Sequence, residues 1–148
     1  MPRRILVLNG PNLNLLGQRE PAIYGRTTLA EIEEMCRAEG KRLGLEVECR
    51  QSNSEGELVG WVQEASGGFD AAVLNAGAYS HTSIALLDAL RSLNKPLIEV
   101  NLSNIYRRES FRQHSYVSLA ADGVICGLGP RGYLLALDAL AAILEEAD

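Results

Sequence analysis

The sequence has few of the residues that mark secreted, membrane-spanning or metal-binding chains. Its 148 residues include three cysteines and two histidines, with no CxxC motif and no Cys/His pair. We therefore expect free thiols in a reducing compartment, without a disulfide framework or a zinc site. No apolar run approaches the roughly 18 residues of a membrane span, and the run Ile5 to Leu8 is too short for a signal peptide. These absences predict a cytoplasmic protein that does not bind membranes.

Basic residues are also scarce. Lys and Arg number 14 against 19 Asp and Glu, which gives a net charge of −5. A general binder of nucleic acid needs a dominant basic face, so we expect no nucleic-acid partner. A local group of arginines can still bind a small anionic ligand. The length and the apolar fraction of 47% fit one globular domain, residues 1–148.

Short apolar segments alternate with helix-length segments along the whole chain. The strands are expected at 5–8, 45–49, 71–74, 96–100 and 123–127, and the helices at 29–44, around 58–65, at 82–93 and at 133–146. Two helix starts carry a capping-box pattern, Thr28-x-x-Glu31 and Ser54-x-x-Glu57. The first, third and fourth strands have the composition of fully buried strands. We predict an α/β fold, a flavodoxin-like doubly wound five-stranded parallel sheet with helices on both faces.

In such folds the ligand binds at the carboxyl ends of the strands. Three loops lie there, at 9–26, 75–83 and 101–115, and their polar residues include Asn12, Asn75, His81, Asn101, Ser103, Asn104, Arg107, Arg108, Arg112 and His114. This set suits an anionic, hydroxylated small molecule, since arginine binds carboxylates and asparagine and serine bind hydroxyls. Taken singly, each residue could instead be a turn former, a helix cap or part of a solvated face. Their convergence at one sheet edge favours a binding site.

A nucleotide site is not expected. Gly127 to Gly132 matches GxGxxG, but no strand with an acidic residue follows it, and Pro130 lacks the N–H that would face a phosphate. We interpret this segment as a tight strand-to-helix turn. The sequence also lacks a GxxxxGK[ST] motif.

Tyr24 is a candidate general base, although it could also be an aromatic side chain packed under a loop. Phenols ionise with a pKa of about 10, and a nearby guanidinium favours the ionised form. Arg19 precedes Tyr24 in a segment bounded by Gly and Pro that can close as a lid. Such a base suits removal of a proton next to a carbonyl, which needs no metal if amides hold a water against the enolate oxygen.

Five segments together resemble the type II 3-dehydroquinate dehydratase family: GPNLNLLGQREPAIYG, NAGAYSHTSIALLDAL, IEVNLSN, FRQHS and GVICGLGPRGYLLAL. The resemblance runs in order over nearly the whole chain. It implies a hydro-lyase of the shikimate pathway that eliminates water from 3-dehydroquinate in the anti sense, through an enolate and without a cofactor. It also implies a homododecamer built from trimers.

The resemblance implies roles for individual residues. Tyr24 matches the base, Arg19 the lid arginine that activates it, and Asn12 the asparagine that holds the enolate-stabilising water. Glu99 matches the carboxylate beside the general acid, and Asp88 the acidic residue contributed by a neighbouring subunit. The substrate-binding positions are matched by Asn75, His81, Arg112 and the backbone amides of Leu102 and Ser103.

One catalytic position departs from the family pattern. Asn101 stands where the family has the general-acid histidine, and an amide cannot release a proton near pH 7. A missing general acid costs roughly 10²–10⁴ in rate. Asn101 could hold a water that relays the proton, with His81 behind it or Tyr106, which stands where the family often has histidine. Alternatively the chain is a paralogue with weak or altered activity on a related cyclohexane carboxylate, or a binding protein without catalysis.

Overall fold

The computed structural model describes residues 1–148, and its centre is a five-stranded parallel sheet with the strand order β2-β1-β3-β4-β5. The strands are β1 (Arg3–Asn9), β2 (Leu45–Gln51), β3 (Ala71–Asn75), β4 (Leu97–Asn101) and β5 (Gly123–Cys126). Each strand ends within two residues of the expected range. The order is that of the flavodoxin-like doubly wound sheet, so the fold prediction is confirmed.

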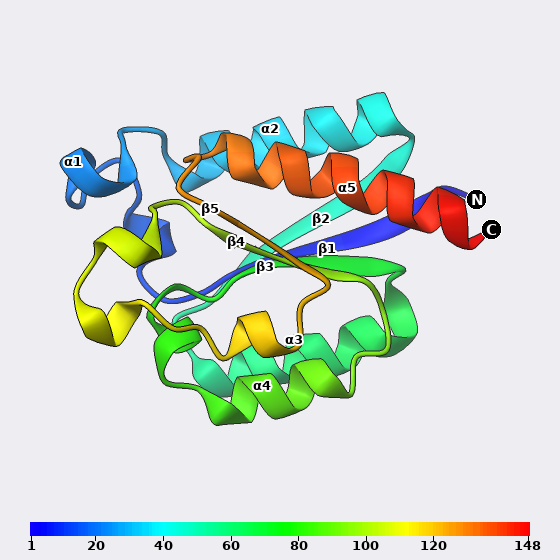
Figure 1. Ribbon diagram of the computed structural model, residues 1–148. Helices are drawn as coiled ribbons and strands as arrows, with labels where there is room; N and C mark the ends of the chain where they lie inside the picture. The colour runs from blue at the N-terminus through cyan, green and yellow to red at the C-terminus, as the bar shows by residue number, and fades with distance from the viewer.

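Helices cover both faces of the sheet (Figure 1). The helices α2 (Leu29–Leu43) and α5 (Arg131–Ala147) lie on one face, and α3 (Glu55–Gly68) and α4 (Ile84–Arg91) lie on the other. Successive residues of β1 alternate between the two cores. Ile5 and Val7 pack under α2 and α5, whereas Leu6 and Leu8 pack under α3 and α4. This alternation explains why β1 is apolar at every central position.

The three inner strands were expected to be buried, and they are. Every residue of β3 and β4 is buried, as are residues 5–9 of β1. The carboxyl ends of β1 and β3 lie side by side, with Asn9 opposite Asn75 in the ladder. The sheet therefore places polar side chains in the core at the end where the loops carry the candidate residues.

The helix starts agree with the sequence in part. The Thr28 hydroxyl accepts the Glu31 N–H at 3.2 Å while the Glu31 carboxylate accepts the Thr28 N–H, so this capping box is confirmed. Ser54 accepts the Glu57 N–H at 3.1 Å, but the return bond is not made. The helix expected from residue 82 begins instead at Ile84, because the Ser83 hydroxyl caps it by accepting the Leu86 N–H.

The loop after β1 contains two helical turns that the sequence did not predict, the 3₁₀ turn Leu13–Leu15 and α1 (Pro21–Tyr24). We call residues 17–26 the lid segment. It projects from the end of the molecule opposite the two termini (Figure 1). The loops after β3 and β4 contain the 3₁₀ turns Gly77–His81, Ile105–Arg107, Ser110–Arg112 and Val117–Leu119. None of the helices combines the length and the apolar character needed to cross a bilayer.

Candidate active site

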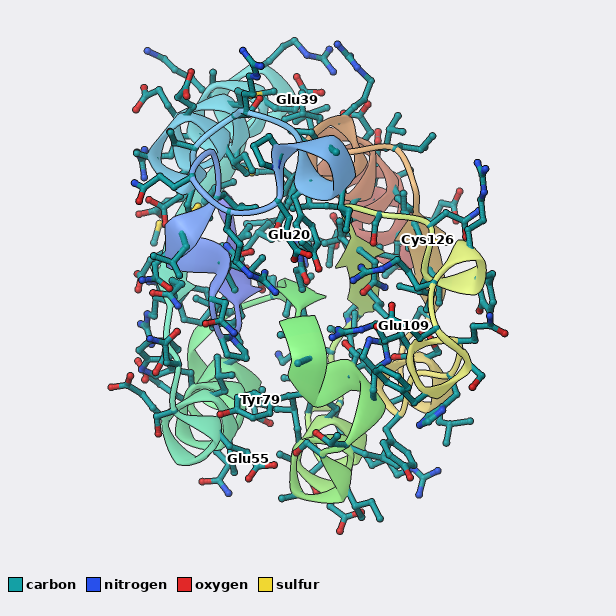
Figure 2. The ribbon with its side chains drawn as sticks, turned by 90° about the vertical axis from the view of Figure 1, so that its left-hand side faces the viewer. Glu20, Glu39, Glu55, Tyr79, Glu109 and Cys126 are labelled. Carbon is teal, nitrogen blue, oxygen red and sulfur yellow. The ribbon has the colours of Figure 1, made fainter.

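A pocket of about 500 Å³, its open mouth included, lies at the carboxyl ends of β1, β3 and β4. Nine of the eleven candidate residues line it: Asn12, Arg19, Tyr24, Asn75, His81, Asn101, Leu102, Ser103 and Arg112. Figure 2 looks onto this end of the molecule, where Glu20, Tyr79 and Glu109 mark the three loops. The pocket therefore occupies the place that the doubly wound fold predicts.

Two guanidinium groups lie near Tyr24. Its hydroxyl accepts a hydrogen bond of 3.1 Å from Arg108 Nη1, which also donates to Ser103 Oγ at 3.2 Å. The Cζ atoms of Arg19 and Arg108 lie 5.1 and 5.4 Å from the centre of the Tyr24 ring. Arg19 was expected to activate Tyr24, but the direct bond comes from Arg108, which the family resemblance had not assigned a role.

The neighbours of Arg108 favour its protonated, charged form. Burial by itself lowers the pKa of Arg108, but its hydrogen bond with Tyr24 and the attraction of Tyr24, Glu109 and Glu20 outweigh that effect and raise the pKa above its ordinary value. The side chain is only 15% exposed. A cation fixed in a partly buried place acts on its neighbours more strongly than one in bulk water. Arg108 is thus the cation best placed to act on the Tyr24 oxygen.

Asn75 and two backbone amides form the floor of the pocket. The Asn75 side chain is fixed by bonds on both of its ends, since Oδ1 accepts the Gly77 N–H at 3.1 Å and Nδ2 donates to the Tyr133 hydroxyl at 2.9 Å. The N–H groups of Leu102 and Ser103 donate no hydrogen bond within the chain. Unpaired N–H groups at a pocket wall suit an anionic oxygen of a ligand.

Asn101 is joined to a buried carboxylate. Its Nδ2 donates to Glu99 Oε2 at 2.8 Å, and Ser115 and Ser118 donate to the same carboxylate. Glu99 is fully buried and lies behind Asn101, outside the pocket wall. These bonds pair both oxygens of the buried carboxylate. The bond to Glu99 leaves Asn101 Oδ1 and one N–H for the pocket.

The two histidines bind each other through their backbones. His81 Nδ1 lies 2.7 Å from the His114 carbonyl oxygen, and His114 Nε2 lies 3.0 Å from that of His81. Carbonyl oxygens only accept, so both of these ring nitrogens carry hydrogen. His81 Nε2 therefore remains for a ligand, and it accepts when the ring is neutral. The alternative of His81 as a helix cap is wrong, because Ser83 caps α4.

Six residues considered from the sequence do not line the pocket: Asp88, Glu99, Asn104, Tyr106, Arg107 and His114. Asp88 is exposed on α4, and Arg107 is exposed beside Arg108. Tyr106 is 59% exposed and lies outside the pocket wall, so the expectation that it stands behind Asn101 is wrong. His114 touches the site only through His81. No group of three His, Cys, Asp or Glu side chains is arranged to bind a metal ion.

Comparison with known proteins gives one consistent family. The family model described as dehydroquinase class II matches residues 3–141. A 3-dehydroquinate dehydratase of Brucella canis is 55% identical over 148 residues, which cover all of this chain and 94% of that protein. One of Variovorax paradoxus is 56% identical over 143 residues, covering 93% of this chain and 98% of that protein.

Solved structures agree with this similarity. The type II dehydroquinase from Propionibacterium acnes superposes with a TM-score of 0.93 at 50% identity, covering 96% of this chain and 98% of that one. The one from Butyrivibrio crossotus gives a TM-score of 0.92 at 45% identity, covering 94% and 97%. A 3-dehydroquinate dehydratase-like protein from Bifidobacterium longum is more distant, with a TM-score of 0.74 at 36% identity, covering 98% and 99%.

Proposed function

Because the chain belongs to the class II dehydroquinase family, we propose that it is a hydro-lyase that converts 3-dehydroquinate into 3-dehydroshikimate in the shikimate pathway. The observation that carries the proposal is the hydrogen bond of 3.1 Å from Arg108 to the Tyr24 hydroxyl, inside a pocket lined by most of the candidate residues. The reaction needs a base for a carbon acid, a means of stabilising an enolate, and a route for water to leave.

Tyr24 is the proposed base. As a phenolate it takes the proton from the carbon next to the ring ketone, and the electrons of the broken C–H bond move onto the ketone oxygen to give an enolate. Arg19 and Arg108 lie with their Cζ atoms 5.1 and 5.4 Å from the centre of the ring, so the phenolate of this step has two cationic neighbours. A positioned base contributes roughly 10²–10⁴ in rate.

Asn12 is the proposed partner of the enolate. Its backbone is left-handed, with φ of 67°, and its N–H donates to Asn53 Oδ1 at 3.0 Å. The side chain makes no hydrogen bond within the chain, so it is free to hold a water against the enolate oxygen. Preorganised donors of this kind stabilise charge that develops in the transition state.

The last step returns the enolate electrons to the ring. The carbonyl re-forms, a C=C bond forms, and the C–O bond to the leaving hydroxyl breaks on the face anti to the proton removed by Tyr24. The hydroxyl leaves as water only if it gains a proton, which the Asn101 amide cannot supply. Asn101 instead holds a water that gives one proton to the leaving hydroxyl and regains one from solvent through His81, which lines the same pocket. The proton taken by Tyr24 is released to solvent, which restores the base.

The floor and the remaining cations fit the polar groups of the substrate. The unpaired amides of Leu102 and Ser103, together with the free Asn75 N–H, suit its carboxylate. His81 and Arg112 suit its hydroxyls. Asp88 completes the site from a neighbouring subunit of a homododecamer built from trimers, in keeping with its exposed place on α4 outside the pocket of its own chain.

A second candidate function rests on Asn101 alone. Its amide is bound to Glu99 in the place of a general acid, so a paralogue that binds a related cyclohexane carboxylate and turns over slowly is the alternative. Both functions require a pocket that binds a cyclohexane carboxylate such as 3-dehydroquinate, and they differ in how fast 3-dehydroquinate is turned over.

Incubation of the purified protein with 3-dehydroquinate distinguishes them. We expect growing ultraviolet absorbance from the conjugated enone in the presence of a chelator and with no nucleotide added. A raised melting temperature without enone formation would favour the alternative, because a ligand that binds only the folded state stabilises it. Neither enone nor a melting shift would refute both functions.

A further inference from the structure

Three buried polar side chains form a row beneath the pocket. Asn9 ends β1, Asn75 ends β3, and Tyr133 lies in the first turn of α5. Asn9 and Tyr133 are fully buried and Asn75 is 3% exposed. Only Asn75 lines the pocket, so the other two cannot touch a ligand there.

The hydrogen bonds of this row run in one direction. Asn75 Nδ2 donates to the Tyr133 oxygen at 2.9 Å, and the Tyr133 hydroxyl donates in turn to Asn9 Oδ1. Burial raises the pKa of Tyr133, which keeps the phenol neutral and able to accept and donate at once. Because Asn9 takes the phenolic hydrogen, the Tyr133 oxygen is left as an acceptor for Asn75.

This direction decides what Asn75 presents to the pocket. Oδ1 of Asn75 accepts the Gly77 N–H, and one Nδ2 hydrogen goes to Tyr133. The second Nδ2 hydrogen is the one polar hydrogen of the side chain with no partner in the chain. With the amide reversed, the Asn75 oxygen would face the pocket and repel an anionic ligand.

Asn9 contains a buried polar group that destabilises the folded chain, so close packing alone does not explain why an asparagine stands at this position. Its Nδ2 is buried without a hydrogen-bond partner, which destabilises a folded chain. A leucine of similar shape would avoid that cost. Asn9 contributes through its Oδ1 atom, which accepts the hydrogen bond from the Tyr133 hydroxyl.

We propose that Tyr133, supported by Asn9, is a positioning residue that holds Asn75 with an N–H toward the pocket and so selects a ligand with an acceptor oxygen at that point. The identity of this ligand as 3-dehydroquinate rests on the proposed function. Tyr133 and Asn9 act through Asn75 and do not contact the reacting groups.

Steady-state kinetics of three variants test the inference. Tyr133→Phe keeps the ring and removes the hydroxyl, and we expect KM for 3-dehydroquinate to rise about tenfold, the effect of one charged hydrogen bond, with kcat changed less. Asn9→Leu removes the acceptor of the Tyr133 hydroxyl hydrogen, so KM should rise in this variant as well. Leu144→Ala, at the far end of the same helix, should lower the melting temperature without changing KM.

The outcomes separate this inference from the proposed function. An unchanged KM in Tyr133→Phe, or an equal rise in Leu144→Ala, would overturn the positioning role even if the wild-type protein is fully active. A wild-type protein that neither binds nor converts 3-dehydroquinate would refute the proposed function and, with it, the ligand assigned to Asn75.

Discussion

The pocket has two parts that hold their polar side chains in place by different contacts. We now count Asn101 with Asn75 and the two backbone amides as the floor, and the other part is the lid segment. On the floor, Asn75 and Asn101 are buried at strand ends, and each side chain is bonded to other buried polar groups. In the lid segment, Tyr24 is half-buried and Arg19 is 35% exposed. The Tyr24 hydroxyl is held by a single hydrogen bond, from Arg108 of the loop after β4.

This difference indicates that the floor and the lid segment have different roles in the site. Buried strand ends orient the floor whether or not a ligand is bound, because their side chains are part of the core. The base, by contrast, has one cationic neighbour in the lid segment itself, Arg19, and gains the other, Arg108, only where the lid segment meets the loop after β4. Binding should therefore depend mainly on the floor, and turnover on the contact between Tyr24 and Arg108.

Among the changes that test this comparison, replacement of Tyr24, the proposed base, should have the largest effect on turnover. We expect Tyr24→Phe to lower kcat by roughly 10²–10⁴, the usual contribution of a general base, while KM changes little because the floor is intact. Enone formation measured by ultraviolet absorbance gives both constants. Tyr106→Phe, at an exposed tyrosine outside the pocket, is the matched control and should behave as wild type. If Tyr24→Phe retains most of its activity, the base is another group.

Removal of Arg108 should have the next largest effect. We expect Arg108→Ala to lower kcat/KM roughly 10- to 100-fold at neutral pH, the effect of one lost hydrogen bond to a charged group. Enone formation at a series of substrate concentrations measures this loss. Arg107→Ala removes the exposed neighbour and should leave kcat/KM unchanged. Equal effects of the two changes would mean that net charge, rather than the contact, matters.

A change on the floor tests the leaving step. A histidine at position 101 would stand between Glu99 and the pocket and could donate a proton, so Asn101→His should raise kcat about tenfold. Asn101→Ala provides the control, since it also removes the amide but supplies no acid. A fall of kcat in Asn101→His would show instead that the native amide belongs to a relay that the imidazole disrupts.

The sequence predicted the floor better than the lid for a physical reason. The apolar runs fix where strands begin and end, and the doubly wound order then brings Asn75 and Asn101 to one edge. Arg107 and Arg108 are adjacent, and the short turn Ile105–Arg107 decides which of them lies against Tyr24. Such a turn leaves almost no periodic signal in the sequence.

The row beneath the floor could not be predicted for a different reason. Tyr133 falls on the apolar face of the last helix, so its pattern is that of an ordinary core residue. Its two partners lie 58 and 124 positions away in the chain. A contact of that range becomes visible only when β1, β3 and α5 are packed together.

The smallest effect is expected where the lid segment joins α2. Thr28→Ala removes the hydroxyl of the capping box, and loss of such a cap costs about 1 kcal/mol in the free energy of unfolding. Urea denaturation measures this cost. Turnover at 25 °C should stay within about twofold of wild type, since the proposed base depends on Arg108 rather than on the helix start.

Ser54→Ala at the start of α3 is the matched control, because it removes the serine cap of a helix on the opposite face of the sheet from α2. The two variants should lose similar stability and keep similar kcat. If only Thr28→Ala loses kcat, the start of α2 also positions Tyr24. The base would then be oriented by the core, as the floor is, and the distinction between a lid fixed by charge and a floor fixed by burial would fail.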